Sequence, residues 1–189
     1  MVQISDFMRK ILIFEGPDGA GKSTIAKALS DKAKIPLMAA LTAPQDPGSY
    51  DGFLMNLVWG EVKLFEFFKS AYGSYLETPI IRDRSFFSEF VYSKVFNRAT
   101  CMKTIDKLAK GYYEAEEFEA LIFVCMREDR RYKTEADEFS SVNSNLEKIH
   151  NGYMDLVENS KLPGRFFRLD TSDEDLDKQL KYIMQVAKL

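Results

Sequence analysis

Short apolar runs alternate along this chain with longer stretches in which apolar residues recur at helical spacing. The runs at residues 11–14, 79–81, 121–126 and 166–169 are rich in β-branched or aromatic side chains, and a weaker run covers residues 36–41. Runs of this length and composition predict buried β-strands. We expect the strand at 79–81 to end where residues 82–84 bring in charged side chains.

The stretches between the runs predict helices. Residues 23–34, 85–95, 102–118 and 142–158 follow a helical pattern, and Asp173 is in position to cap a last helix that reaches the C-terminus. Residues 42–52 hold two prolines and two glycines and predict a loop. The stretch 53–75 is apolar on nearly all sides. It is therefore either a buried helix of a monomer or a helix packed on a second copy in a homodimer.

Strands that alternate with helices predict an α/β fold, with five parallel strands and helices on both faces of the sheet. No repeat and no Gly/Ser linker divides the 189 residues, so we expect a single domain over residues 1–189. Ligands of such sheets bind at the carboxyl ends of the strands. We therefore expect the binding and catalytic residues in the segments that directly follow the strands.

Composition excludes several classes of protein. Hydrophobic residues make up 46% and charged residues 29%, which argues against disorder, and the net charge of −3 argues against duplex nucleic-acid binding. Cys101 and Cys125 form no CxxC pair. Their spacing argues against a disulfide scaffold and fits a reducing, cytoplasmic location. No run approaches the about 18 apolar residues of a membrane span, and the first residues lack the core of a signal peptide.

A glycine-rich loop follows the first predicted strand. It fits the pattern GxxxxGK[ST] at every fixed position and lies between a predicted strand and a predicted helix. Its glycines let backbone N–H groups converge on one point, and the helix adds positive charge at its N-terminus. The pattern predicts a site for the phosphates of ATP, and an ordinary strand-to-helix turn is the alternative. The candidate nucleotide-binding residues are Gly16, Asp18, Gly19, Ala20, Gly21, Lys22, Ser23 and Thr24.

Two side chains of this loop carry the expected chemistry. Lys22 can reach the β- and γ-phosphates of a nucleotide, and Ser23 can ligate Mg²⁺. ATP and Mg²⁺ are therefore the expected cofactors.

Residues 14–24, FEGPDGAGKST, resemble the thymidylate kinase family of nucleoside monophosphate kinases, which has a similar EG-x-D/E-G-x-GK-S/T-T. Residues 83–92, DRSFFSEFVY, look like the family's DR-x₃-S-x₂-A-Y/F, with Val91 in place of the usual alanine. Residues 127–132, Tyr153 and the last strand resemble the family's lid and closing strand more loosely. The resemblance implies a three-layer P-loop kinase fold. It also implies transfer of phosphate from Mg-ATP to a small nucleotide, dTMP or a related deoxynucleoside monophosphate.

The resemblance implies roles for the matched residues. Asp18 would hold the 3′-hydroxyl of the acceptor sugar, and Arg84 would hold phosphate near the transfer point. Asp83 would help to organise Mg²⁺ through water. Ser88 and Tyr92 also match the family's motif, and the resemblance implies that they help to bind the acceptor.

The family also stacks the acceptor base on an aromatic residue of the helix before the DR motif, with an arginine four positions further on. A count back from Asp83 without gaps places Trp59 and Lys63 at these positions, one helical turn apart on one face. The alternatives are a core residue of an apolar helix for Trp59 and a surface charge for Lys63.

A charged segment follows the strand at 121–126, and we expect a lid at about residues 127–140. Arg127, Arg130 and Arg131 are candidates to neutralise the migrating phosphoryl group, because guanidinium groups suit its charge. A solvated run of charges is the alternative. His150 has no second metal ligand nearby and is expected to lie on the surface or pack. The resemblance implies that residues 170–172 border the adenine, and a cap of the final helix is the alternative.

The match fails after the second strand. The family has Arg-Glu-Pro-Gly there, and its arginine binds the acceptor phosphate, whereas residues 41–48 here read LTAPQDPG. Arg82 and Lys63 are candidate substitutes. Deoxynucleoside kinases, whose E/D-R-S motif resembles residues 83–85, need a carboxylate base at that place, which this chain also lacks. A nucleotide acceptor is favoured, because its phosphate is already ionised. A deoxynucleoside kinase and a non-catalytic nucleotide-binding switch are the alternatives.

Overall fold

The computed structural model of this chain describes residues 9–38, 79–98, 110, 118–132, 143–162, 164–173 and 175–189. The strands are β1 (Arg9–Glu15), β2 (Leu37–Met38), β3 (Ile80–Asp83), β4 (Phe118–Met126) and β5 (Arg165–Asp170). The helices with bounds in this part of the chain are α1 (Lys22–Ala33), α3 (Phe87–Phe96), α6 (Leu146–Asn159) and α7 (Leu176–Ala187).

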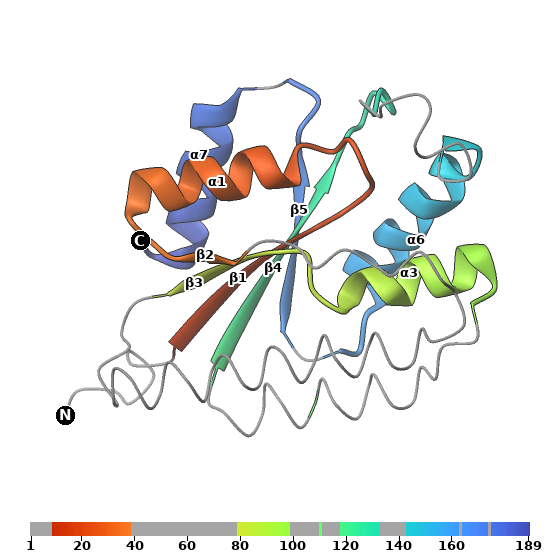
Figure 1. Cartoon of the computed structure of the whole chain (residues 1–189), viewed down its shortest axis with the longest axis horizontal. Helices are drawn as coiled ribbons and strands as arrows, with labels where there is room; N and C mark the ends of the chain where they lie inside the picture. Colours follow the sequence, from red (N-terminus) through yellow and green to blue (C-terminus); the bar gives the residue numbers. More distant parts are fainter. Residues whose placement is uncertain are drawn as a thin grey trace.

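The strands form one parallel sheet with the order β2-β3-β1-β4-β5. This confirms the expected α/β fold with a five-stranded parallel sheet. β1 lies in the middle, so β3 and β4 flank it (Figure 1). Because the carboxyl ends of parallel strands meet at one edge, the segments after β1, β3 and β4 come together there.

Both faces of the sheet are apolar, and helices cover each of them. Ile11 and Ile13 of β1 belong to a core shared with α3 and α6, whereas Leu12 and Phe14 belong to a core shared with α1 and α7. The two helix pairs lie on opposite sides of the sheet (Figure 1). Full burial of one such side chain stabilises the fold by about 1.5–3 kcal/mol. A run such as 11–14, which is apolar at every position, therefore favours three layers.

Two predicted strand boundaries are wrong. β3 does not end at residue 81 but continues through Arg82 and Asp83, because these residues pair with Ile13 and Phe14 of β1. Phe118 does not end a helix but begins β4. Pairing with β1 thus overrides the local polar signal.

The cap predicted for the last helix is also wrong. Asp175, rather than Asp173, is the N-cap of α7, and its carboxylate accepts the backbone N–H of Lys178 at 3.0 Å. The loop predicted at 42–52 and the helix predicted at 53–75 lie outside the described residues. Within the ranges above, the helices are too short or too polar to cross a membrane.

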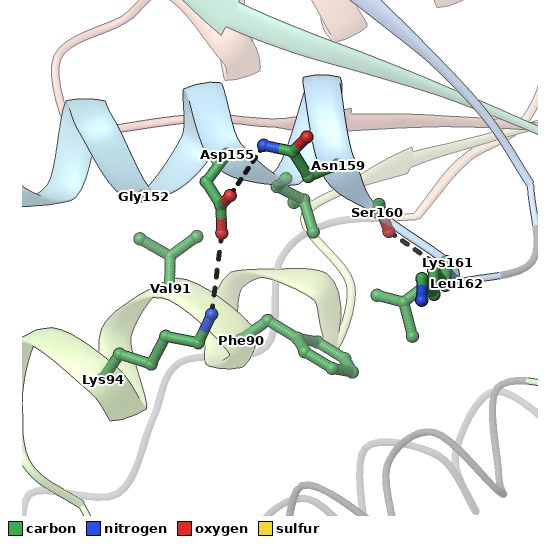
Figure 2. Close-up of a pocket in the computed structure, with 10 residues that line it drawn as sticks. Phe90, Val91, Lys94, Gly152, Asp155, Asn159, Ser160, Lys161 and Leu162 are labelled. Carbon is green, nitrogen blue, oxygen red and sulfur yellow. Dashed lines mark hydrogen bonds and ion pairs between the residues drawn. The ribbon is translucent and has the colours of Figure 1, made fainter.

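The α3 and α6 helices approach each other closely at Gly152. A Cβ atom at this position would lie 2.7 Å from Cγ1 of Val91 on α3, a distance shorter than side chains tolerate. Figure 2 shows Val91 on the side of α3 that faces Gly152. The close crossing holds Tyr153, the next residue of α6, in the core against α3.

Candidate functional site

The predicted phosphate loop connects β1 to α1 at the carboxyl edge of the sheet. Its glycines at positions 16, 19 and 21 have φ angles of 135°, 76° and 83°, which L side chains rarely adopt. A Cβ at Gly16 would also lie 2.1 Å from the carbonyl oxygen of Cys125 on β4. The first glycine is therefore required both for its backbone angle and for its contact with β4.

Lys22 begins α1, and its ammonium lies inside the loop. Its Nζ donates to the carbonyl oxygen of Pro17 at 2.6 Å, and the side chain is buried. Gly21, the N-cap, offers no side-chain cap to the first turn, and the side chains of Ser23 and Thr24 are exposed. The loop thus encloses the Lys22 ammonium and leaves the hydroxyls of Ser23 and Thr24 accessible.

The charge of Lys22 is poorly stabilised in the free protein. Burial, together with the nearby Arg84 guanidinium, lowers the pKa of Lys22 to about 7, although Asp18 and Glu15 act in the opposite direction. Near neutral pH the ammonium is therefore easily lost. A polyanion in the loop would favour the charged form.

Above neutral pH, the binding of a nucleotide should therefore be accompanied by protonation of the Lys22 amine. Lys22 has a pKa of about 7 in the free protein, and bound phosphates would raise it. At lower pH the lysine is already protonated, so affinity does not change through this group. At higher pH each unit weakens MgATP binding by up to about tenfold, until the pKa of the complex is passed. Calorimetry in buffers of different ionisation enthalpy measures the uptake. A dissociation constant that stays flat up to about pH 9 contradicts this prediction.

Arg84 joins the phosphate loop to the residues predicted on the acceptor side. Its guanidinium forms an ion pair with Asp18 and donates to the carbonyl oxygen of Gly16 at 3.0 Å and to Oγ of Ser88 at 3.1 Å. Tyr92 donates its hydroxyl to the other oxygen of Asp18 at 3.0 Å. Arg84 therefore forms one connected cluster with four residues that were predicted from the loop and the DR motif: Gly16, Asp18, Ser88 and Tyr92.

The same contacts set the charges of this cluster. Burial alone would raise the pKa of Asp18, but the Arg84 guanidinium and then Lys22 hold it below its usual value. Burial raises the pKa of Tyr92 well above its usual value, so this phenol stays a hydrogen-bond donor. Arg84 itself has a φ of 61°, an uncommon angle for a side chain of this size, and its N–H donates to Phe14 O at 2.9 Å. The backbone is thus held in the geometry that turns the guanidinium to the loop.

The sequence analysis placed Glu15 and Tyr153 within matched segments but gave neither a role in the site, although both belong to the cluster. Glu15 is fully buried at the end of β1 and accepts from the N–H of Ser85 at 2.8 Å. Tyr153 donates to Oγ of Ser88 at 3.1 Å and lies 3.3 Å from the Arg84 guanidinium. A carboxylate at the carboxyl end of a strand was a signal for Glu15 in the sequence. Tyr153 is four-fifths of the way along the chain, and only the crossing of α3 and α6 brings it here.

Asp83 fits a role beside a divalent cation. It ends β3 with 8% of its surface exposed, and its Oδ1 has no hydrogen-bond partner among the described residues. A buried carboxylate oxygen of this kind is costly unless a cation or water meets it. Across those residues no three His, Cys, Asp or Glu side chains form a metal cluster. The oxygen of Asp83 and the exposed hydroxyl of Ser23 suit Mg²⁺ held mainly by phosphates and water.

The start of the predicted lid is ordered against the end of β5. Arg127 is buried and makes a two-point ion pair with Asp129, at 3.1 and 3.0 Å, and it donates to the carbonyl oxygen of Ser172 at 3.3 Å. This pairing lowers the pKa of Asp129 to about 2. Arg130 and Arg131 are exposed. The three predicted arginines therefore have different environments.

His150 lies in the protein interior, which agrees with the packing role, one of the two roles expected from the sequence. It is buried on α6, and its Nδ1 lies 2.5 Å from the hydroxyl of Tyr132. The residues predicted to hold the acceptor base, Trp59 and Lys63, lie outside the described residues.

A groove of about 360 Å³ also lies between α3 and α6. Phe90, Val91 and Leu156 are among the apolar residues that line it, and an ion pair of 3.7 Å between Lys94 and Asp155 borders it (Figure 2). No residue predicted to carry chemistry lines this groove. The carboxyl edge of the sheet is therefore the candidate site.

Comparison with known proteins establishes the fold. Neither a protein-family model nor a curated protein sequence matches the chain. YorR from Bacillus subtilis, solved in complex with phosphorylated GDP, matches with a TM-score of 0.58 and 23% identity over 94% of this chain and 95% of that chain. Deoxyadenosine kinase from M. mycoides, with bound dCMP and dCDP, has a TM-score of 0.52 and 19% identity over 95% and 98% of the two chains. Thymidylate kinase from Ehrlichia chaffeensis has a TM-score of 0.54 and 16% identity over 95% and 99%. The expected P-loop kinase fold is confirmed.

Proposed function

We propose that this protein transfers the γ-phosphoryl group of ATP to the phosphate of a deoxynucleoside monophosphate, dTMP or a related nucleotide. One observation carries the proposal. The Arg84 guanidinium donates to the Gly16 carbonyl of the phosphate loop and pairs with Asp18 in the same cluster. Groups suited to a donor phosphate and to an acceptor thus lie side by side, and phosphoryl transfer depends mainly on such positioning.

On the donor side, the loop and Lys22 would hold the phosphates of ATP. The Lys22 ammonium would exchange the Pro17 carbonyl for phosphate oxygens, which restores its charge. Ser23 and Asp83 would hold Mg²⁺, whose chemistry is to neutralise charge on the β- and γ-oxygens.

On the acceptor side, Asp18 would accept the sugar 3′-hydroxyl, with Ser88 and Tyr92 holding its surroundings in place. Arg84 would bind the acceptor phosphate. Each would exchange a contact within the cluster for a contact with substrate. Trp59 and Lys63 would hold the base.

The segment at about 127–140 would close over the donor and exclude water. Arg127 would lie closest to the adenine end, because it contacts Ser172 after β5. Arg130 and Arg131, which are exposed, would be free to turn toward the migrating phosphoryl group.

A deoxynucleoside acceptor is the second candidate. The similarity to deoxyadenosine kinase supports it, as does the Asp83-Arg84-Ser85 sequence. The two candidates differ in what accepts the phosphoryl group: an ionised phosphate, or a sugar hydroxyl that needs a base.

An acceptor panel tests the proposal. ADP formation from MgATP is measured with each deoxynucleoside monophosphate, with each deoxynucleoside, and with no acceptor. The proposal expects turnover that depends on a monophosphate, dTMP first. Turnover with nucleosides alone would support the second candidate, and turnover that no acceptor changes would overturn both.

A further inference from the structure

Glu15 is a buried carboxyl group to which the proposed phosphoryl transfer gives no role. Its side chain is fully buried at the end of β1, between the loop and the segment that follows β3. Burial raises the pKa of Glu15, while Arg84, Ser88, Ser85 and Lys22 all favour the ionised form. A carboxylate is costly at such a place unless hydrogen bonds and a cation compensate for its burial.

The two oxygens of Glu15 hold the turn that carries Arg84. One accepts the backbone N–H of Ser85 at 2.8 Å, and the other accepts the hydroxyl of Ser88 at 2.5 Å. Arg84 lies just before this turn, and its own N–H is fixed by Phe14, the neighbour of Glu15. The last two residues of β1 therefore hold the backbone of Arg84 and the turn that follows it.

The hydroxyl of Ser88 connects Glu15 to the guanidinium. A serine hydroxyl has one proton and two lone pairs. Its proton goes to Glu15, and its oxygen receives the Arg84 guanidinium at 3.1 Å and the Tyr153 hydroxyl at 3.1 Å. Because both oxygens of Glu15 act as acceptors, Glu15 sets the direction of the Ser88 proton and leaves both lone pairs of Ser88 for Arg84 and Tyr153.

The two carboxylates around Arg84 differ in how they can respond to a substrate. Asp18 belongs to the phosphate loop and is partly exposed, so a ligand can reach it. Glu15 is fully buried and cannot be reached. When an acceptor takes the place of the Asp18–Arg84 contact, the Glu15 carboxyl keeps its hydrogen bonds to Ser85 and Ser88.

We propose that Glu15 is a positioning residue, the fixed carboxylate that acts through Ser88 to keep the Arg84 guanidinium aimed at the acceptor phosphate while Asp18 exchanges Arg84 for the substrate. This inference rests on the proposed function for its kinetic consequence. Its structural consequence, a guanidinium that is held still, does not depend on that function.

The test replaces Glu15 by glutamine, which keeps the shape and an oxygen for Ser85 but removes the charge and adds a donor facing Ser88. Displacement of a binding group by about 1 Å can lower a rate about 10²-fold. We expect Glu15→Gln to lower kcat/KM for the acceptor about 10- to 100-fold, while the KM for ATP stays within about twofold of wild type. Ser88→Ala should have the same effect, and the double variant should be no worse than either single one.

Glu89→Gln is the matched control. Glu89 is also a buried carboxylate, on α3, but its partner is Arg98 at 2.9 Å. This variant should leave the acceptor KM and kcat at their wild-type values. If it lowers them as much as Glu15→Gln does, loss of any buried carboxylate explains the effect and the proposal is wrong.

Nitrogen NMR of the Arg84 guanidinium separates this inference from the proposed function. The wild-type signal should show hindered rotation, and Glu15→Gln should release it. If no acceptor supports turnover in the wild type, the proposed function fails, and this signal alone decides the role of Glu15. An unchanged signal, or an unchanged kcat/KM in an active enzyme, overturns the proposal.

Discussion

Lys22→Ala should lower ATP-dependent turnover by at least about 10²–10³-fold, the cost of removing one preorganised donor from a phosphoryl-transfer site. The free energy of unfolding of this variant should not fall along with its activity. The Lys22 ammonium is buried, and burial lowers its pKa to about 7, so the fold does not gain from its charge. Below that pH the wild type carries a buried cation that the variant lacks, so the variant should unfold at the same or a slightly higher denaturant concentration.

Steady-state assays and denaturant unfolding measure the two effects. Lys27→Ala is the matched control, because Lys27 is an exposed lysine of the same helix. It should leave both quantities unchanged. Wild-type turnover in Lys22→Ala would remove the basis for the proposed function.

Arg84→Lys should lower acceptor-dependent kcat about 10³-fold, at the lower end of what a guanidinium contributes to phosphoryl transfer. Charge is kept in this variant, so the loss reports geometry. Arg84 reaches Asp18 with one nitrogen and Gly16 and Ser88 with another, and a single ammonium cannot hold this spacing. Some stability should also be lost, about 1–3 kcal/mol, because buried acceptors are left unsatisfied.

The acceptor panel and unfolding curves measure this variant as well. Arg98→Lys serves as the comparison, because Arg98 lies over the Tyr92 ring at 5.7 Å, as Arg84 does at 5.8 Å, but forms its ion pair with Glu89 rather than with Asp18. Equal losses of kcat in the two variants would mean that packing on Tyr92, rather than the hydrogen bonds from the two nitrogens of the Arg84 guanidinium, sets the rate.

Much of the fold could be predicted from the sequence because burial determines it locally. The run at 11–14 is apolar on both faces, and a strand covered on both faces is what it forms. The phosphate loop could be predicted for a similar reason, because its glycines and Lys22 follow one another in the chain. Arg84 and Asp18 were predicted only as separate members of motifs, and the structure adds that they touch.

The remaining errors and omissions come from contacts between distant segments. Arg82 and Asp83 look like a strand end by composition, but pairing with β1 extends β3 through them. Asp173 and Asp175 are equally good caps by residue type, and the choice depends on where the chain leaves β5. Tyr153 was part of a loose resemblance, but its contacts with Ser88 and Arg84 could not be predicted, since they depend on the close crossing of α3 and α6.

The two ends of the phosphate loop are not equally constrained. At Gly16 the Cys125 carbonyl would lie 2.1 Å from an added Cβ, whereas at Gly21 no atom lies within 4 Å of one. A side chain at residue 16 would therefore collide with the backbone of β4, whereas at residue 21 only the φ angle of 83° opposes one. Replacement of Gly16 by alanine should displace the loop from the sheet, whereas the same change at Gly21 should strain the backbone locally.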